Sequence, residues 1–77
     1  MVEAAEDLLR MLGLGQLRVR ADGGGARIEL EKQEMEKALK MGEDIALKLK
    51  ALGFSYVSLD LEGYRSGSMD EVLWTSR

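Results

Sequence analysis

The sequence contains no cysteine, no histidine and no proline, and aromatic residues make up only 5% of its 77 residues. The absence of cysteine excludes disulfides, thiolate metal sites and a cysteine nucleophile. The absence of histidine removes the commonest general base and the commonest metal ligand. Any chemistry of this chain must therefore rest on carboxylates, guanidinium groups, hydroxyls and backbone amides.

Charge and hydropathy narrow the class of protein further. The net charge of −3 argues against indiscriminate binding of nucleic acid, which normally needs a basic balance. No apolar run is long enough to span a membrane and no signal-peptide pattern is present, so we expect a cytoplasmic protein without membrane contact. The length predicts one small domain over residues 1–77 with slim stability.

Apolar residues recur at helical spacing in some segments and alternate in others, which predicts both helices and strands. The sequence Asp22-Gly23-Gly24-Gly25 between two alternating segments predicts a β-hairpin. Gly42 interrupts a helical pattern and predicts either a kink or two helices, the second starting near Glu43. The predicted elements are a helix over 2–12, strands over 16–21 and 26–30, helical structure over 31–52, a strand over 54–61 and a short helix after Ser68.

The element order α-β-β-α-β predicts an α+β fold. We expect a two-layer sandwich in which a three-stranded, mainly antiparallel sheet carries helices on one face. If the crossover is right-handed and the third strand lies beside the first, the strand order is 2-1-3. Such a domain would be a ferredoxin-like fragment that lacks one strand.

Alternation along the strands gathers polar residues on the sheet face opposite the helices. They are Arg18, Arg20, Arg27, Glu29, Tyr56, Ser58 and Asp60. One interpretation is a solvated face with cross-strand ion pairs. The other is an anion site, because Arg18 and Arg20 are i, i+2 neighbours and the planar guanidinium suits phosphate or carboxylate. The residue pattern alone leaves both interpretations open.

Two further groups of residues are candidates for a site. Residues 62–68 end the last strand with glycines and serines, whose backbone amides can approach a ligand, and Ser68 would begin a helix. The carboxylates of Glu6, Glu29 and Asp60 could bind a hard cation if the fold brings them together.

The segments RVR…ARIEL and ALGFSYVSLDLEGYRSGSMDEVL resemble the C-terminal region of the ATP-dependent sacrificial sulfur transferases, the LarE-type PP-loop ATPases. The resemblance covers almost the whole chain, and LDLEGYRSGS is its most specific mark. It implies a larger enzyme whose N-terminal PP-loop domain, absent from these residues, holds ATP and Mg²⁺. Members adenylylate a substrate carboxylate and then insert sulfur, in one branch on the way to a nickel-pincer cofactor. Without that loop or a cysteine, we expect this chain to bind no cofactor and to be inactive alone.

The resemblance also implies roles for particular residues. Arg18 and Arg20 match arginines that bind a substrate phosphate or carboxylate, and Arg65 and Ser66 are expected beside them. Glu6 and Glu29 match acids that lie near that site and could contact a metal ion. The signature loop is Gly63, Tyr64, Arg65, Ser66 and Gly67, with packing and subunit contact as roles alongside chemistry. Many members carry His-Gly where this chain has Ala21-Asp22-Gly23. The role of that histidine is therefore missing here, and the resemblance does not determine the substrate.

Three functions follow as alternatives. The first is the substrate-side domain of a sulfur transferase, with the PP-loop domain and an anionic small molecule as partners in a homo-oligomer. The second is an oligomerisation or interdomain packing module without a ligand. The third, an RNA-contacting appendage, rests only on the arginines at 18, 20, 27 and 65 and is disfavoured by the net acidity.

Overall fold

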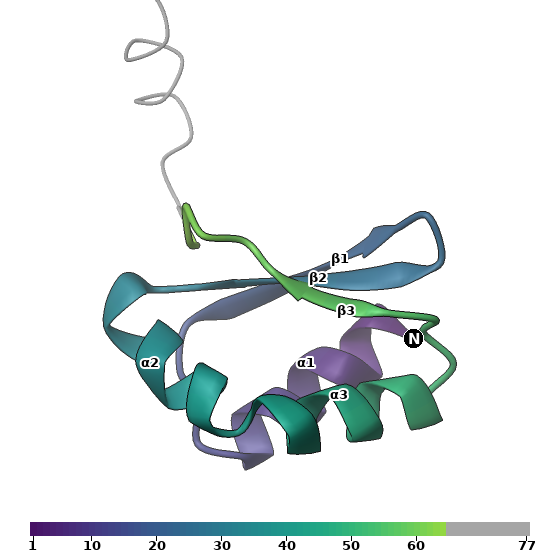
Figure 1. Cartoon of the computed structure of the whole chain (residues 1–77), viewed down its shortest axis with the longest axis horizontal. Coiled ribbons are helices and arrows are strands. Elements are labelled where there is room, and N and C mark those ends of the chain that lie inside the picture. The colour runs from purple at the N-terminus through teal and green to yellow at the C-terminus, as the bar shows by residue number, and fades with distance from the viewer. Residues whose placement is uncertain (65–77) are drawn as a thin grey trace, which may run out of the picture.

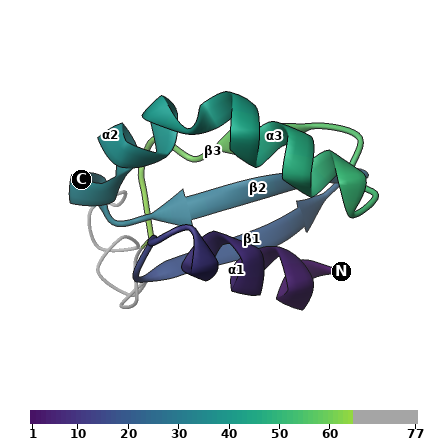
Figure 2. The ribbon, with the colours of Figure 1, turned by 90° about the horizontal axis from the view of Figure 1, so that it is seen from below.

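The computed structural model describes residues 1–64, which form three helices and three strands. In chain order they are α1 (Val2–Met11), β1 (Leu17–Asp22), β2 (Gly25–Leu30), α2 (Lys32–Lys40), α3 (Gly42–Ala51) and β3 (Val57–Leu59). All three helices cover one face of a single sheet (Figure 1), and the view from below places α1 beneath β1 and α3 beneath β2 and β3 (Figure 2). The predicted α+β two-layer fold is confirmed. The helix expected after Ser68 lies outside the described residues.

The sheet has the order β1-β2-β3, so β2 is central and the predicted order 2-1-3 is wrong. β1 and β2 form the predicted antiparallel hairpin, while β3 runs parallel to β2, which makes the sheet mixed. At the outer edge of β1, the Glu6 carboxylate of α1 accepts a hydrogen bond from the backbone N–H of Val19 (2.9 Å). The α2–α3 crossover lays β3 beside β2, the strand that precedes it in the chain.

The helical pattern over residues 31–52 forms two helices, as the glycine at 42 predicted. The break falls at Met41, whose backbone (φ −101°, ψ 17°) leaves the helical region, and α3 begins at Gly42. The three helices have only nine or ten residues each. No helix in residues 1–64 is long and apolar enough to cross a membrane.

The core lies between the helices and the covered face of the sheet. Leu9 of α1, Leu30 of β2 and Leu49 of α3 are fully buried, and the alternating Val19 and Ile28 join them. Val57 and Leu59 of β3 pack against this cluster. Alternation along the strand predicted over 54–61 would place Leu61 on the same face, but Leu61 is 78% exposed, because β3 ends at Leu59 and a turn follows.

Candidate functional site

The sheet face turned away from the helices carries the charged side chains of β1 and β2, together with Ser58 of β3 and Asp60 just after it, and we call it the polar face. Alternation positions these residues, since neighbouring side chains on a strand point to opposite sides. Tyr56 closes one end of the face, where its hydroxyl donates a hydrogen bond to the backbone oxygen of Asp22 (2.6 Å). The ring lies against Gly25, and a Cβ at that position would overlap it.

Glu29 lies between two arginines at the centre of the polar face. Its carboxylate is 3.6 Å from Nε of Arg20 and 3.7 Å from Nη2 of Arg27. The Glu29 side chain is only 11% exposed, whereas the side chains of Arg20 and Arg27 are about half exposed (48% and 41%). A nearly buried carboxylate needs such compensation, because an isolated charge there would be costly.

Arg27 is the most fully engaged cation of the face. In addition to Glu29, it contacts Asp22 (Nη1 to Oδ2, 3.7 Å) and Asp60 (Nε to Oδ2, 4.0 Å). Its Nε is buried and makes no hydrogen bond within residues 1–64, so Asp60 balances it only as an ion pair. All three nitrogen positions of Arg27 thus face acids, and this side chain ties β1, β2 and the end of β3 together.

Arg18 and Arg20 each have guanidinium N–H groups that make no ion pair or hydrogen bond with residues 1–64. The Arg18 guanidinium lies over the Tyr64 ring, 5.6 Å from the ring centroid, and no carboxylate of residues 1–64 pairs with it. Arg20 uses Nε toward Glu29, which leaves its two terminal nitrogens. Both arginines stand on β1 at positions i and i+2, so their unused donors belong to the same face.

The three predicted carboxylates do not form one cluster. Glu29 and Asp60 both contact Arg27, whereas Glu6 lies at the outer edge of β1, hydrogen-bonded to Val19. Within residues 1–64 no group of three or more acidic, histidine or cysteine side chains could hold a metal ion. Guanidiniums already neutralise two of these acids, so the trio does not fit a cation, and we assign no metal chemistry to it.

The start of the signature loop is part of the described structure. A turn forms from Asp60 to Gly63, in which the Gly63 N–H donates to the Asp60 backbone oxygen (3.1 Å) and the Glu62 N–H donates to Asp60 Oδ1 (2.9 Å). Tyr64 follows this turn and returns to the polar face beside Arg18. The remaining loop residues, Arg65, Ser66 and Gly67, lie outside the described residues.

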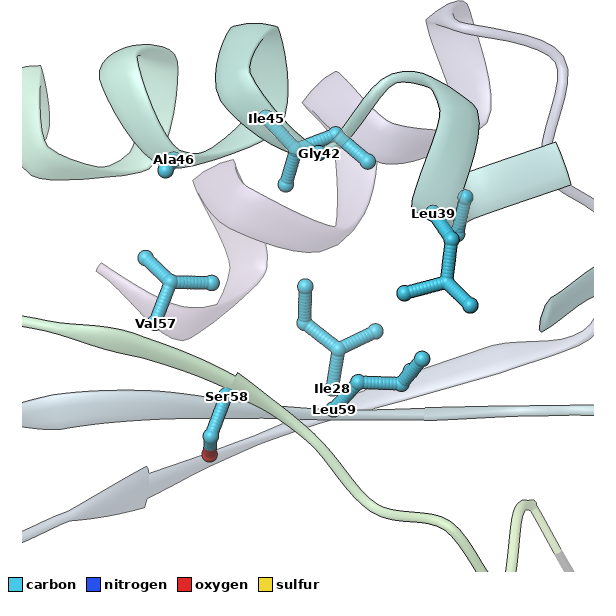
Figure 3. Close-up of a pocket in the computed structure, with 9 residues that line it drawn as sticks. Ile28, Leu39, Gly42, Ile45, Ala46, Val57, Ser58 and Leu59 are labelled. Atoms are coloured by element: carbon cyan, nitrogen blue, oxygen red, sulfur yellow. The ribbon is translucent and has the colours of Figure 1, made fainter. Parts of the chain in front are cut away.

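A shallow pocket of about 230 Å³ lies on the opposite, helical side of the sheet, between β3 and the α2–α3 break. Its walls are apolar: Ile28, Val57 and Leu59 face Ile45 and Ala46 across it (Figure 3). The hydroxyl of Ser58 points to the other side of β3 (Figure 3). No charged side chain lines this pocket, so it cannot be the site that the arginines predict.

Residue patterns alone did not single out Asp22 and Arg27 as members of the site. Asp22 appeared only as a turn residue, and Arg27 only as one of several surface charges. The register of the hairpin could have identified them. It places Arg20 directly opposite Arg27, and two like charges at paired positions are stable only with acids nearby.

The described residues define the class of this chain: a small α+β domain whose uncovered sheet face carries three guanidiniums balanced by three carboxylates. Over 72 residues, 94% of its length, it is 44% identical to pyridinium-3,5-bisthiocarboxylic acid mononucleotide synthase from Lactiplantibacillus plantarum. It is 43% identical over 75 residues to an uncharacterized protein from Synechocystis sp.. No protein-family model matches the chain.

These similarities confirm the resemblance to LarE-type proteins and are consistent with a C-terminal domain of that type. The chain covers 26% of the synthase and 28% of the Synechocystis protein, so it spans about a quarter of the length of the curated relatives it matches.

Proposed function

We propose that this chain is the substrate-side, C-terminal domain of an ATP-dependent sulfur transferase of the LarE type. In this proposal Arg18 and Arg20 bind a phosphate or carboxylate of the substrate. The similar synthase is named for a mononucleotide with two thiocarboxylic acid groups; such a molecule carries an anionic phosphate, and its thiocarboxylic acid groups are the sulfur analogues of carboxylic acids. The identity over nearly the whole chain supports the class, and the polar face supports the ligand.

One observation carries the assignment to Arg18 and Arg20. Of the three arginines described on the polar face, Arg27 has acids at all three nitrogen positions, whereas Arg18 and Arg20 keep donors free of described partners. An anion needs such donors, because a bidentate guanidinium contact uses two parallel N–H groups. Arg65 and Ser66 would extend this site from the signature loop.

The remaining chemistry belongs to other parts of such an enzyme. ATP and Mg²⁺ would bind a PP-loop domain, where the substrate carboxylate is activated by adenylylation. The chain holds no cysteine to supply sulfur. Its role would be to bind and orient the anionic substrate while a homo-oligomeric, cytoplasmic enzyme completes the reaction. The balanced polar face, with equal numbers of guanidiniums and carboxylates, gives no support to RNA binding.

The proposal is tested by NMR titration of the 77-residue chain with inorganic phosphate and with nicotinic acid mononucleotide. We expect the side-chain N–H signals of Arg18 and Arg20 to shift in a saturable manner. Arg18→Gln and Arg20→Gln should each weaken binding about tenfold or more, since a charge-assisted contact contributes about 1.5–3 kcal/mol.

Arg10→Gln is the matched control, because Arg10 lies on α1 beneath the sheet, is 52% exposed and pairs only with Asp7 in residues 1–64. It removes the same charge and should leave the affinity unchanged. If neither ligand moves the Arg18 or Arg20 signals, or if all three variants weaken binding equally, the assignment of an anion site is wrong.

The apolar pocket favours a second candidate function, the packing of one copy of this chain against another. Within residues 1–64, Val57 and Leu59 belong to an edge strand that pairs with β2 on one side only, and Leu39 at the pocket is 67% exposed. An open edge beside apolar surface can pair with another chain. Light scattering at high concentration decides: a stable oligomer that Leu39→Glu disrupts supports packing, and a strict monomer contradicts it.

A further inference from the structure

The aromatic ring of Tyr64 lies against the Arg18 guanidinium on the polar face. The guanidinium carbon lies over the ring, 5.6 Å from its centroid, within the distance at which a cation is attracted to an aromatic face. Arg18 and Tyr64 are far apart in the sequence, one in β1 and the other in the segment after β3. Their contact therefore depends on the path of the turn that leads into Tyr64.

Backbone geometry fixes this path at Gly63. The Tyr64 N–H donates a short hydrogen bond to the backbone oxygen of Leu30 (2.7 Å), which anchors the loop to the end of β2. Gly63 has φ +87°, and a Cβ there would lie 2.7 Å from that same oxygen. Only glycine meets both requirements at low cost. The conformation of Gly63 thus delivers the Tyr64 ring to Arg18.

An aromatic ring beside an arginine leaves its positive charge in place, whereas a carboxylate beside an arginine offsets that charge. Glu29 takes up the Nε of Arg20 and offsets its charge. The Tyr64 ring is neutral and carries no carboxylate, so it attracts Arg18 without offsetting its charge, and no carboxylate of residues 1–64 pairs with the Arg18 N–H groups. Tyr64 therefore restricts the motion of Arg18 without competing with an anion for its donors.

We infer that Tyr64 is a positioning residue, whose ring preorganises Arg18 to bind an anion. This inference rests on the proposed anion site. It assigns the tyrosine of the signature loop to the support of a particular arginine, through a contact that uses the ring and not the hydroxyl. Preorganisation of this kind raises affinity because less side-chain freedom is lost on binding.

The first test needs no ligand. In NMR spectra of the 77-residue chain, the ring should shift the side-chain N–H signal of Arg18 upfield. Tyr64→Phe keeps the ring and should keep that shift, whereas Tyr64→Leu should abolish it while the backbone amide spectrum stays folded. An Arg18 signal that is the same in all three proteins overturns the contact itself.

The second test is titration of the same proteins with inorganic phosphate. Tyr64→Phe should bind like the parent, and Tyr64→Leu should bind about two- to fivefold more weakly, the range expected of an exposed cation–aromatic contact. In an Arg18→Gln background, Tyr64→Leu should have no further effect on the residual affinity.

The outcomes separate the inference from the function on which it rests. If phosphate shifts Arg18 but Tyr64→Leu binds it as tightly as the parent, the positioning role is wrong and the anion site stands. If phosphate shifts no arginine signal in the parent, the proposed anion site fails, even where the ring contact is present. Weaker binding by Tyr64→Phe would show that the hydroxyl matters and would also overturn the inference.

Discussion

Arg20 and Arg27 stand directly opposite each other in the β1–β2 register, with Glu29 in contact with both. Like charges at directly paired positions repel, and the pair would destabilise the hairpin without an acid nearby. Glu29 supplies that acid from a site where its own side chain is only 11% exposed. It offsets the repulsion and also reduces the charge that Arg20 can offer to a ligand.

This dual role predicts opposite changes in stability and in affinity. Glu29→Gln should lower the free energy of unfolding by about 1 kcal/mol, since it removes the acid shared by two half-exposed arginines. The same substitution should raise the affinity for inorganic phosphate by a few fold, because Arg20 is no longer neutralised. Urea unfolding and phosphate titration of the same protein samples measure the two effects.

Glu36→Gln is the control for Glu29→Gln. Glu36 is exposed on α2, beneath the sheet, so the substitution changes the net charge equally and should alter neither quantity. A Glu29→Gln protein that loses both stability and phosphate affinity would contradict the role assigned to Glu29.

Two glycines should respond to alanine in opposite directions. A Cβ at Gly25 would overlap the Tyr56 ring, so Gly25→Ala must displace the ring and break the hydrogen bond from its hydroxyl to Asp22. We expect a loss of about 1–2 kcal/mol. A Cβ at Gly42 meets no atom within 4 Å, and the residue is helical, so Gly42→Ala should stabilise the protein by about 0.5–1 kcal/mol.

Thermal unfolding measures both glycine variants, since 1 kcal/mol corresponds to a shift in Tm of about 4–8 °C for a domain of this size. Each alanine variant serves as the control for the other. Equal losses at the two positions would contradict the structure around Tyr56 or around the α2–α3 break.

The carboxylate of Glu6 should protect the outer edge of β1. Glu6→Ala leaves the Val19 N–H without its acceptor, and we expect a loss of about 1 kcal/mol. Glu6→Gln keeps an oxygen acceptor of the same reach and should lose little. Hydrogen exchange reports on the site directly: the Val19 amide should exchange faster in Glu6→Ala, while that of Leu49 should follow only the change in global stability.

If Glu6→Gln and Glu6→Ala accelerate exchange at Val19 equally, a charge and not the hydrogen bond protects this edge.

Local patterns predicted the hairpin and the membership of the polar face because both depend on short-range rules. The glycine-rich turn after Asp22 fixes which residues pair, and alternation then decides which side each faces. The break near Gly42 is equally local. These features need no knowledge of distant contacts.

The position of β3 and the partners of each arginine could not be predicted in this way. β3 pairs with β2 and not with β1, a choice between two edges of the hairpin that the local pattern of either strand does not contain. The turn at Gly63 decides that Tyr64 reaches Arg18, and tertiary packing decides that Asp60 reaches Arg27. Alternation assigns a side chain to a face but not to a partner on that face.

The balance of charges on the polar face has a consequence for how a ligand arrives. The polar face carries three guanidiniums and three carboxylates, so their fields largely offset one another at a distance, and salt screens what remains beyond about one Debye length, roughly 8 Å at physiological ionic strength. Such a surface exerts little long-range electrostatic steering, and its association rate should depend only weakly on salt. An anion would be recognised on contact, and direct transfer from a neighbouring domain would suit this face better than capture from dilute solution.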